Sequence, residues 1–101
     1  MTPRRIKLSP YTYTVREVRG LQDSGACAPD YEAILVDAEQ SDGQKRDTLL
    51  HEALHGIIRQ GLEQQFKDVD KSFEESVVSF FAPRLLGLLR DNPALVEYLT
   101  S

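Results

Sequence analysis

The first part of the chain carries short apolar and β-branched runs separated by turn-forming residues. Residues 11–18 read Tyr-Thr-Tyr-Thr-Val-Arg-Glu-Val and are rich in β-branched and aromatic side chains, which predicts a strand. The short apolar run within residues 31–38 predicts a second strand. Residues 20–29 are rich in turn formers and predict a connection between the strands. Residues 1–10 hold two prolines and three basic residues, and we expect an N-terminal arm there.

The second part of the chain changes to a helical period. Asp47 is the expected N-cap of a first helix. Apolar side chains then recur at spacings of three and four, at Leu49, Leu50, Leu54, Ile57, Ile58 and Leu62. This spacing predicts an amphipathic helix with one apolar face. Residues 64–70 are expected to form a loop or a frayed helix end.

Two further helices are expected towards the C-terminus. One begins near Lys71, and Pro83 should kink or restart it because proline lacks an amide proton. The pair Asn92-Pro93 combines a capping residue with proline at the first helical position, which predicts a last short helix ending near Leu99. We expect Phe73, Phe80, Phe81 and the leucines of these helices to be core residues.

These elements predict one α+β domain over residues 1–101. A small N-terminal sheet, a hairpin or a meander, packs on the first helix, and two more helices follow. Lys plus Arg is 12 and Asp plus Glu is 16, so the net charge of −4 argues against binding to a nucleic-acid backbone. No apolar run approaches the roughly 20 residues that cross a bilayer, and no secretory signal is expected. We expect the single cysteine, Cys27, to be a buried small residue or an inert thiol, and a lone cysteine fits a cytoplasmic protein.

The strongest chemical signal is the pentapeptide His51-Glu52-Ala53-Leu54-His55 inside the first predicted helix. Residues four apart share one helix face, so the two imidazoles can reach one metal ion. Glu52 would then flank the metal and act as a general base towards water. The competing interpretation is that both histidines only pack in a core. Because the chain has two histidines and both belong to the motif, we favour a metal site.

A zinc site of this kind needs a third protein ligand, and no third histidine exists. Glu74 and Glu75 open the second helix and offer carboxylates. Their alternative role is to complement the dipole at the helix N-terminus. If the second helix packs on the first, its early residues should lie near His51 and His55.

The motif followed by a glutamate on a second helix resembles the gluzincin metallopeptidases. The separation of 20 residues between His55 and Glu75 matches thermolysin-like enzymes. Residues 75–86 are similar to the glutamate helix of ImmA/IrrE-type metallopeptidases, although Val78-Ser79 stands where an Ala-Asn pair is usual. The resemblance covers residues 48–99 and is greatest to a minimal, phage-borne branch. When the glutamate helix is aligned with the family on Phe81-Ala82 and Leu85-Leu86, the resemblance implies Glu75 as the third ligand. When it is aligned on Val77-Val78 instead, the resemblance implies Glu74.

The sequence therefore predicts a zinc metalloendopeptidase that hydrolyses a protein or peptide substrate. One Zn²⁺ ion would be held by His51, His55 and Glu75, with Glu52 as the base. We expect no nucleic-acid or membrane partner. We expect the protein to be located in the cytoplasm, and in the host cytoplasm if a phage encodes the chain. The alternative is a non-catalytic, zinc-stabilised interaction or regulatory module, including a form whose site is covered by residues 96–101.

Two features of a peptidase stay open at the level of sequence. Residues 34–36 are either an edge strand that pairs with substrate or the central strand of the sheet. The oxyanion-stabilising group is unassigned, because spacing does not choose among Tyr11, Tyr13, Tyr31, Tyr98, Arg59 and Arg84.

Overall fold

The computed structural model describes residues 2–60 and 70–101 and shows the expected α+β arrangement, with the sheet first and three α-helices after it. In chain order the elements are β1 (Arg5–Leu8), β2 (Tyr11–Val18), β3 (Gly25–Ala28), the short 3-10 helix η1 (Pro29–Tyr31), β4 (Ala33–Asp37), α1 (Asp42–Gln60), α2 (Lys71–Asp91) and α3 (Pro93–Thr100). Most of the predicted loop at residues 64–70 lies outside the described residues.

The four strands form one mixed sheet in the order β1-β2-β4-β3. β1 and β2 are an antiparallel hairpin, β2 and β4 are parallel, and β3 pairs antiparallel with β4. The N-terminal arm was therefore predicted wrongly, since residues 5–8 form an edge strand whose Leu8 is buried. The connection expected at residues 20–29 contains β3, which forms the opposite edge of the sheet.

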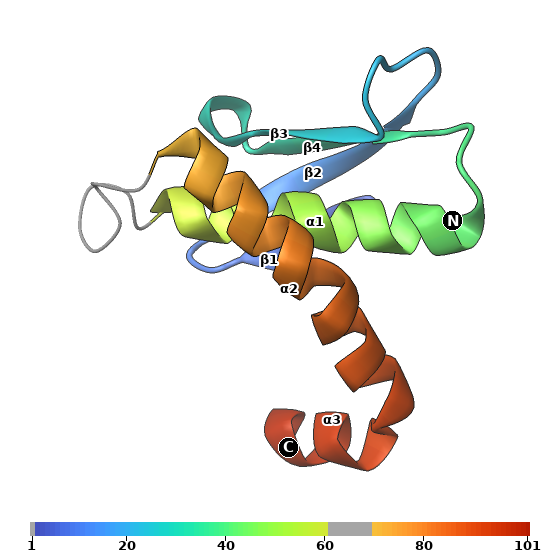
Figure 1. The fold of residues 1–101 in the computed structure, drawn as a ribbon, viewed down its shortest axis with the longest axis vertical. Helices are drawn as coiled ribbons and strands as arrows, with labels where there is room; N and C mark the ends of the chain where they lie inside the picture. The colour runs from blue at the N-terminus through green and yellow to red at the C-terminus, as the bar shows by residue number, and fades with distance from the viewer. Residues whose placement is uncertain (1, 61–69) are drawn as a thin grey trace.

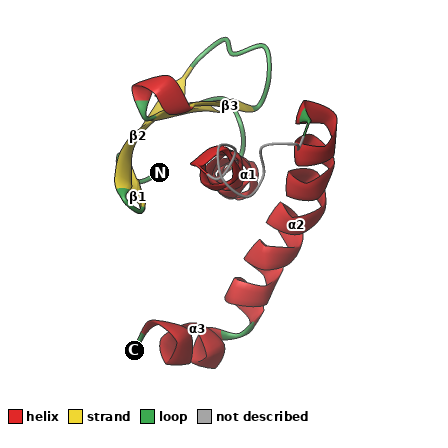
Figure 2. Ribbon diagram, turned by 90° about the vertical axis from the view of Figure 1, so that its left-hand side faces the viewer, coloured by secondary structure: helices red, strands yellow, loops and turns green. Residues whose placement is uncertain are grey.

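One face of the sheet is buried because side chains alternate along each strand. In β2, Tyr13 and Val15 are buried while their neighbours point to solvent, and in β4 Ile34 and Val36 are completely buried. This face packs on α1, which contributes Ala53 to the same core. Figure 2 shows the resulting layers, with α1 between the sheet and α2.

The motif helix α1 begins at Asp42, five residues before the predicted N-cap Asp47. Ser41 and Gln44 explain the earlier start. The Ser41 hydroxyl accepts from the Gln44 amide at 3.2 Å, and the Gln44 side chain accepts from the Ser41 amide at 3.1 Å. This reciprocal capping box satisfies two amides that the first turn would otherwise leave without partners. Asp47 consequently lies inside the helix.

The second helix packs on α1 through residues spaced four apart. Glu74, Val78 and Ala82 are its buried residues. The N-cap is Asp70, whose carboxylate accepts from the Phe73 amide at 2.7 Å. Pro83 does not divide the helix, which continues to Asp91 although proline removes one backbone donor. These contacts place the first turns of α2 beside the C-terminal half of α1 (Figure 1).

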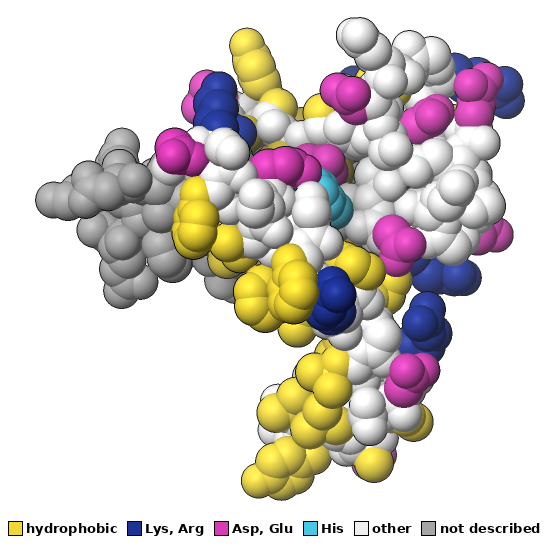
Figure 3. Space-filling view, in the orientation of Figure 1, with side chains coloured by type: hydrophobic (Ala, Val, Ile, Leu, Met, Phe, Trp, Pro, Cys, Tyr) yellow, Lys and Arg dark blue, Asp and Glu magenta, His cyan; other side chains and the backbone are white. Residues whose placement is uncertain are grey.

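The remainder of α2 and all of α3 extend away from the sheet (Figure 1). The prediction that Phe73, Phe80 and Phe81 are core residues was wrong, since each is about half exposed or more. These three side chains lie off the face that carries Val78 and Ala82. The same prediction was wrong for the leucines of α2 and α3, none of which is buried. Figure 3 shows apolar side chains gathered along this extension. Among the described residues, no helix has both the length and the apolar composition needed to cross a membrane.

Candidate metal centre

The two histidines of α1 lie with their Nε2 atoms close together. Nε2 of His51 lies 3.2 Å from Nε2 of His55, and the ring centroids are 4.9 Å apart. The spacing of four residues places both side chains on one face of the helix. His55 is buried and His51 is partly exposed, so the pair lies at the boundary between the core and a cleft.

The neighbouring helix adds a carboxylate to this pair. Oε1 of Glu75 lies 3.0 Å from Nε2 of His51, and Oε2 lies 2.8 Å from Nε2 of His55. One ligand atom from each of the three residues lies within 4.8 Å of the other two. The structure therefore brings together the three residues that the sequence predicts as ligands.

The chemistry of these atoms fits a zinc ion. A carboxylate oxygen and an unprotonated ring nitrogen are both acceptors, so they converge this closely only around a shared proton or a shared cation. Nitrogen and oxygen ligands of tetrahedral zinc lie about 3.4 Å from one another. The observed separations of 2.8–3.2 Å are close to that value. Three protein ligands leave a fourth position, as catalytic zinc sites require.

Glu74, the alternative third ligand, faces a different atom. Its Oε1 lies 2.8 Å from Nδ1 of His55, on the far side of the imidazole ring from the cluster. Only 4% of Glu74 is exposed, whereas the side chain of Glu75 is 56% exposed. Successive residues of a helix point about 100° apart, which is why these two carboxylates reach opposite nitrogens of the same ring.

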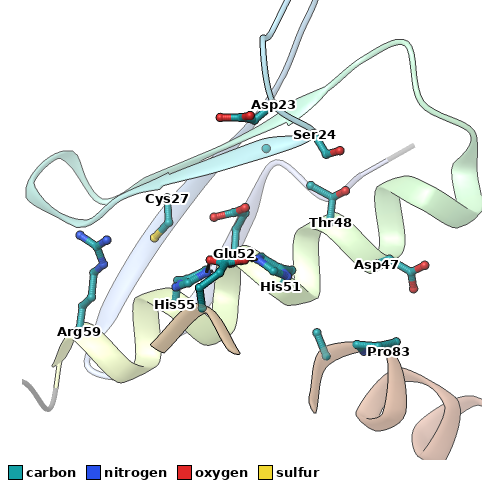
Figure 4. A pocket seen from close by; sticks show the side chains of 13 residues that line it. Asp23, Ser24, Cys27, Asp47, Thr48, His51, Glu52, His55, Arg59 and Pro83 are labelled. Carbon is teal, nitrogen blue, oxygen red and sulfur yellow. Dashed lines mark hydrogen bonds and ion pairs between the residues drawn. The ribbon is translucent and has the colours of Figure 1, made fainter. Parts of the chain in front are cut away.

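Glu52 stands beside the cluster without joining it. Its side chain lines the cleft together with both histidines (Figure 4). Burial raises the pKa of the Glu52 carboxyl above its usual value, and the nearby imidazoles of His51 and His55 reduce that rise. A carboxylate of raised pKa is a better proton acceptor than an ordinary surface glutamate, which suits a general base.

The pKa of Glu75 shifts in the opposite direction to that of Glu52. Burial favours its neutral form, but the hydrogen bond donated by Ser79 at 3.1 Å and the interactions with His51 and His55 outweigh it. The pKa of Glu75 is therefore lowered. An ionised carboxylate is the form that binds a metal cation.

The cluster opens into a cleft of about 670 Å³ between β3, α1 and α2. β3 crosses above the motif helix in Figure 4, with Ser24 just before its first residue and Cys27 near its end. Residues 34–36 belong to β4, which lies between β2 and β3. The edge-strand interpretation of residues 34–36 was therefore wrong, and β3 is the edge that borders the cleft.

The close approach of β3 to α1 depends on Gly25. A Cβ at this position would lie 2.5 Å from Cγ2 of Thr48 and 2.8 Å from the backbone oxygen of Leu35. Both distances are shorter than van der Waals contact. Only glycine fits this place between the edge strand and the motif helix.

The cleft also contains side chains outside the predicted metal site. Cys27 lines it, and burial together with the nearby Glu52 carboxylate raises the pKa of its thiol to about 11. Such a thiol stays protonated and unreactive at neutral pH. Of the six side chains considered for oxyanion stabilisation, Arg59 alone lines the cleft.

The C-terminal residues lie far from this site. None of the residues lining the cleft belongs to α3, which contacts α2 at its other end (Figures 1 and 2). Covering of the site by residues 96–101, expected for a self-blocked form, is not present in this structure.

Comparisons of the chain with models of protein families, with curated proteins and with solved structures found no match.

Proposed function

We propose that this chain is a zinc-dependent metalloendopeptidase of the gluzincin type. The observation that carries the proposal is the convergence of His51, His55 and Glu75 at one point of an open cleft, with Glu52 beside them. Two histidines and one carboxylate are the ligand set of a catalytic zinc site. The resemblance of residues 48–99 to ImmA/IrrE-type metallopeptidases agrees with this assignment.

The metal ligands and Glu52 have different parts in the proposed reaction. His51, His55 and Glu75 would hold the ion, which when bound supplies Lewis-acid activation of water and of the scissile carbonyl. Glu52 accepts the proton of the attacking water and then delivers it to the leaving amine. The raised pKa of Glu52 favours both transfers, because the group is neither a very weak base nor a very weak acid near neutral pH.

The substrate would lie in the cleft as an extended peptide along β3. This strand pairs with β4 on one side and forms the edge of the sheet on the other. An edge strand offers backbone groups to a peptide, and such pairing recognises an extended chain without selecting its sequence. A cytoplasmic location, in the host if a phage encodes the chain, is part of the same proposal and rests on the single cysteine.

The mechanism is tested by replacing the base while leaving the ligands in place. We expect Glu52→Gln to retain zinc and to hydrolyse a library of internally quenched peptides about 10²–10⁴ times more slowly than the unmodified protein. Glu97→Gln, which changes an exposed carboxylate on α3, is the matched control and should leave the rate unchanged. Equal hydrolysis by zinc-loaded Glu52→Gln and the unmodified protein would exclude Glu52 as the base.

The alternative function is a zinc-stabilised interaction or regulatory module without catalysis. A fourth protein ligand would favour it, because such a site has no position for water. The cluster found among the described residues contains three ligands and faces a cleft. An intact Glu52 in that cleft further favours the peptidase.

A further inference from the structure

Glu74 occupies a position where helix packing calls for an apolar side chain. It shares the buried face of α2 with Val78 and Ala82, four and eight residues further along. Those two residues are 1% and 2% exposed, and Glu74 is 4% exposed. Burying a carboxylate is costly unless charged or hydrogen-bonding partners compensate. The partners of Glu74 therefore indicate what the carboxylate does there.

Both partners belong to the last turns of α1. Oε1 of Glu74 lies 2.8 Å from Nδ1 of His55, and the same oxygen lies 3.6 Å from Nε of Arg59. A carboxylate accepts hydrogen bonds, so Nδ1 of His55 is the donor and carries a proton. The Arg59 guanidinium therefore places a positive charge beside the buried carboxylate.

A proton on Nδ1 determines what Nε2 can do. A neutral imidazole has one N–H and one free lone pair, so protonated Nδ1 leaves the lone pair on Nε2. That nitrogen faces Glu75 and His51 in the candidate metal centre. Two successive glutamates thus contact the two nitrogens of one ring, Glu74 from the buried side and Glu75 from the cleft.

We propose that Glu74 is a positioning residue that holds His55 in the Nδ1–H tautomer and in the ring orientation that a metal ligand needs. The proposal rests on the proposed zinc centre and assigns a role to a residue outside its ligand set. Carboxylates behind metal-bound histidines raise the basicity of the ligand, and their loss costs 10–100-fold in metal affinity.

The first test measures zinc affinity by competition with a chromophoric chelator. Glu74→Gln keeps the size of the side chain and removes its charge, and we expect zinc to bind about 10–100-fold more weakly than to the unmodified protein. Glu97→Gln makes the same chemical change at an exposed carboxylate on α3 and should leave the affinity unchanged. Glu74→Met, which suits the apolar face, is a second variant and should also bind zinc more weakly.

The second test reads the tautomer of His55 directly in the metal-free protein. Imidazole ¹⁵N spectra, recorded where both histidines are neutral, should show the proton on Nδ1 of His55 in the unmodified protein. Glu74→Met should lose this preference because no acceptor remains. A side chain that only fills space would change the melting temperature and leave both the tautomer and the zinc affinity unchanged.

The outcomes separate this proposal from the zinc centre itself. Unmodified protein that binds no zinc would overturn both proposals. Zinc binding that is equally tight in the unmodified protein, Glu74→Gln and Glu74→Met would overturn the role of Glu74 and leave the metal centre standing. An Nε2–H tautomer of His55 in the unmodified protein would also overturn the role of Glu74.

Discussion

Nε2 of His51 and Nε2 of His55 lie 3.2 Å apart on the side of α1 that faces the cleft. The separation is close to that of two ligands of one tetrahedral ion, about 3.4 Å. It follows from the helix alone, because residues one turn apart project in the same direction. The second helix then completes the arrangement with Glu75 in the cleft and Glu74 behind His55.

The fit between β3 and α1 predicts unequal effects of two glycine substitutions. Gly25→Ala places a methyl group against Thr48 and the Leu35 carbonyl, and we expect it to lower the free energy of unfolding by about 1–3 kcal/mol. Gly43→Ala, in the first turn of α1, meets no atom within 4 Å and should raise it by up to about 1 kcal/mol. Urea denaturation of the metal-free proteins measures both, and an equal change in the two variants would contradict the packing described.

Cys27 provides a chemical test of the cleft environment. Because the pKa of its thiol is raised to about 11, alkylation of the metal-free protein by iodoacetamide should be slow at neutral pH. The rate should still be rising at about pH 10 if the thiolate is the reacting form. Glu52→Gln removes a nearby negative charge and should move the profile to lower pH. A profile already level near pH 9 would show that the thiol is not buried beside a carboxylate.

The contact between β2 and the start of α1 predicts a pH-dependent contribution to stability. Glu17 accepts from Nζ of Lys45 at 2.7 Å and from the Thr2 hydroxyl at 2.9 Å, and these bonds lower its pKa to about 2. A carboxyl whose pKa is lowered by folding stabilises the folded state above its unfolded pKa of about 4.3. That contribution should be lost as the pH falls from there through about 2.

The comparison of melting temperatures between the unmodified protein and Glu17→Gln measures this contribution. The unmodified protein should melt higher at neutral pH, and the difference should shrink as the solution is acidified. Glu97→Gln should show no such trend. A difference that stays constant down to about pH 2 would mean that the Glu17 contacts do not depend on its charge.

The local sequence was sufficient to predict the candidate site residues that lie on α1. The two histidines and Glu52 follow from their spacing in a helical segment, and β2 was predicted with its correct bounds. The start of α1 carried a local signal that was missed. Ser41 and Gln44 have the spacing of a capping box, and Asp47 was taken as the cap in their place.

The third ligand and the strand β3 could not be predicted from local sequence, because both depend on contacts between segments distant in sequence. Glu74 and Glu75 point about 100° apart around α2, so the rotation of this helix about its axis decides which of them faces the cleft. The packing of Val78 and Ala82 on α1 sets that rotation. The strand β3 consists of Gly25, Ala26, Cys27 and Ala28, whose small side chains carry little strand signal. It is a strand because it pairs with β4, and it thereby becomes the edge above the cleft.

We propose that this chain holds one zinc ion through His51, His55 and Glu75. Isothermal titration of the metal-free protein with zinc measures this directly. We predict one ion per chain, and loss of that binding when His51 and His55 are both replaced by alanine. Absence of binding to the unmodified protein, or equal binding by the double variant, would contradict the account.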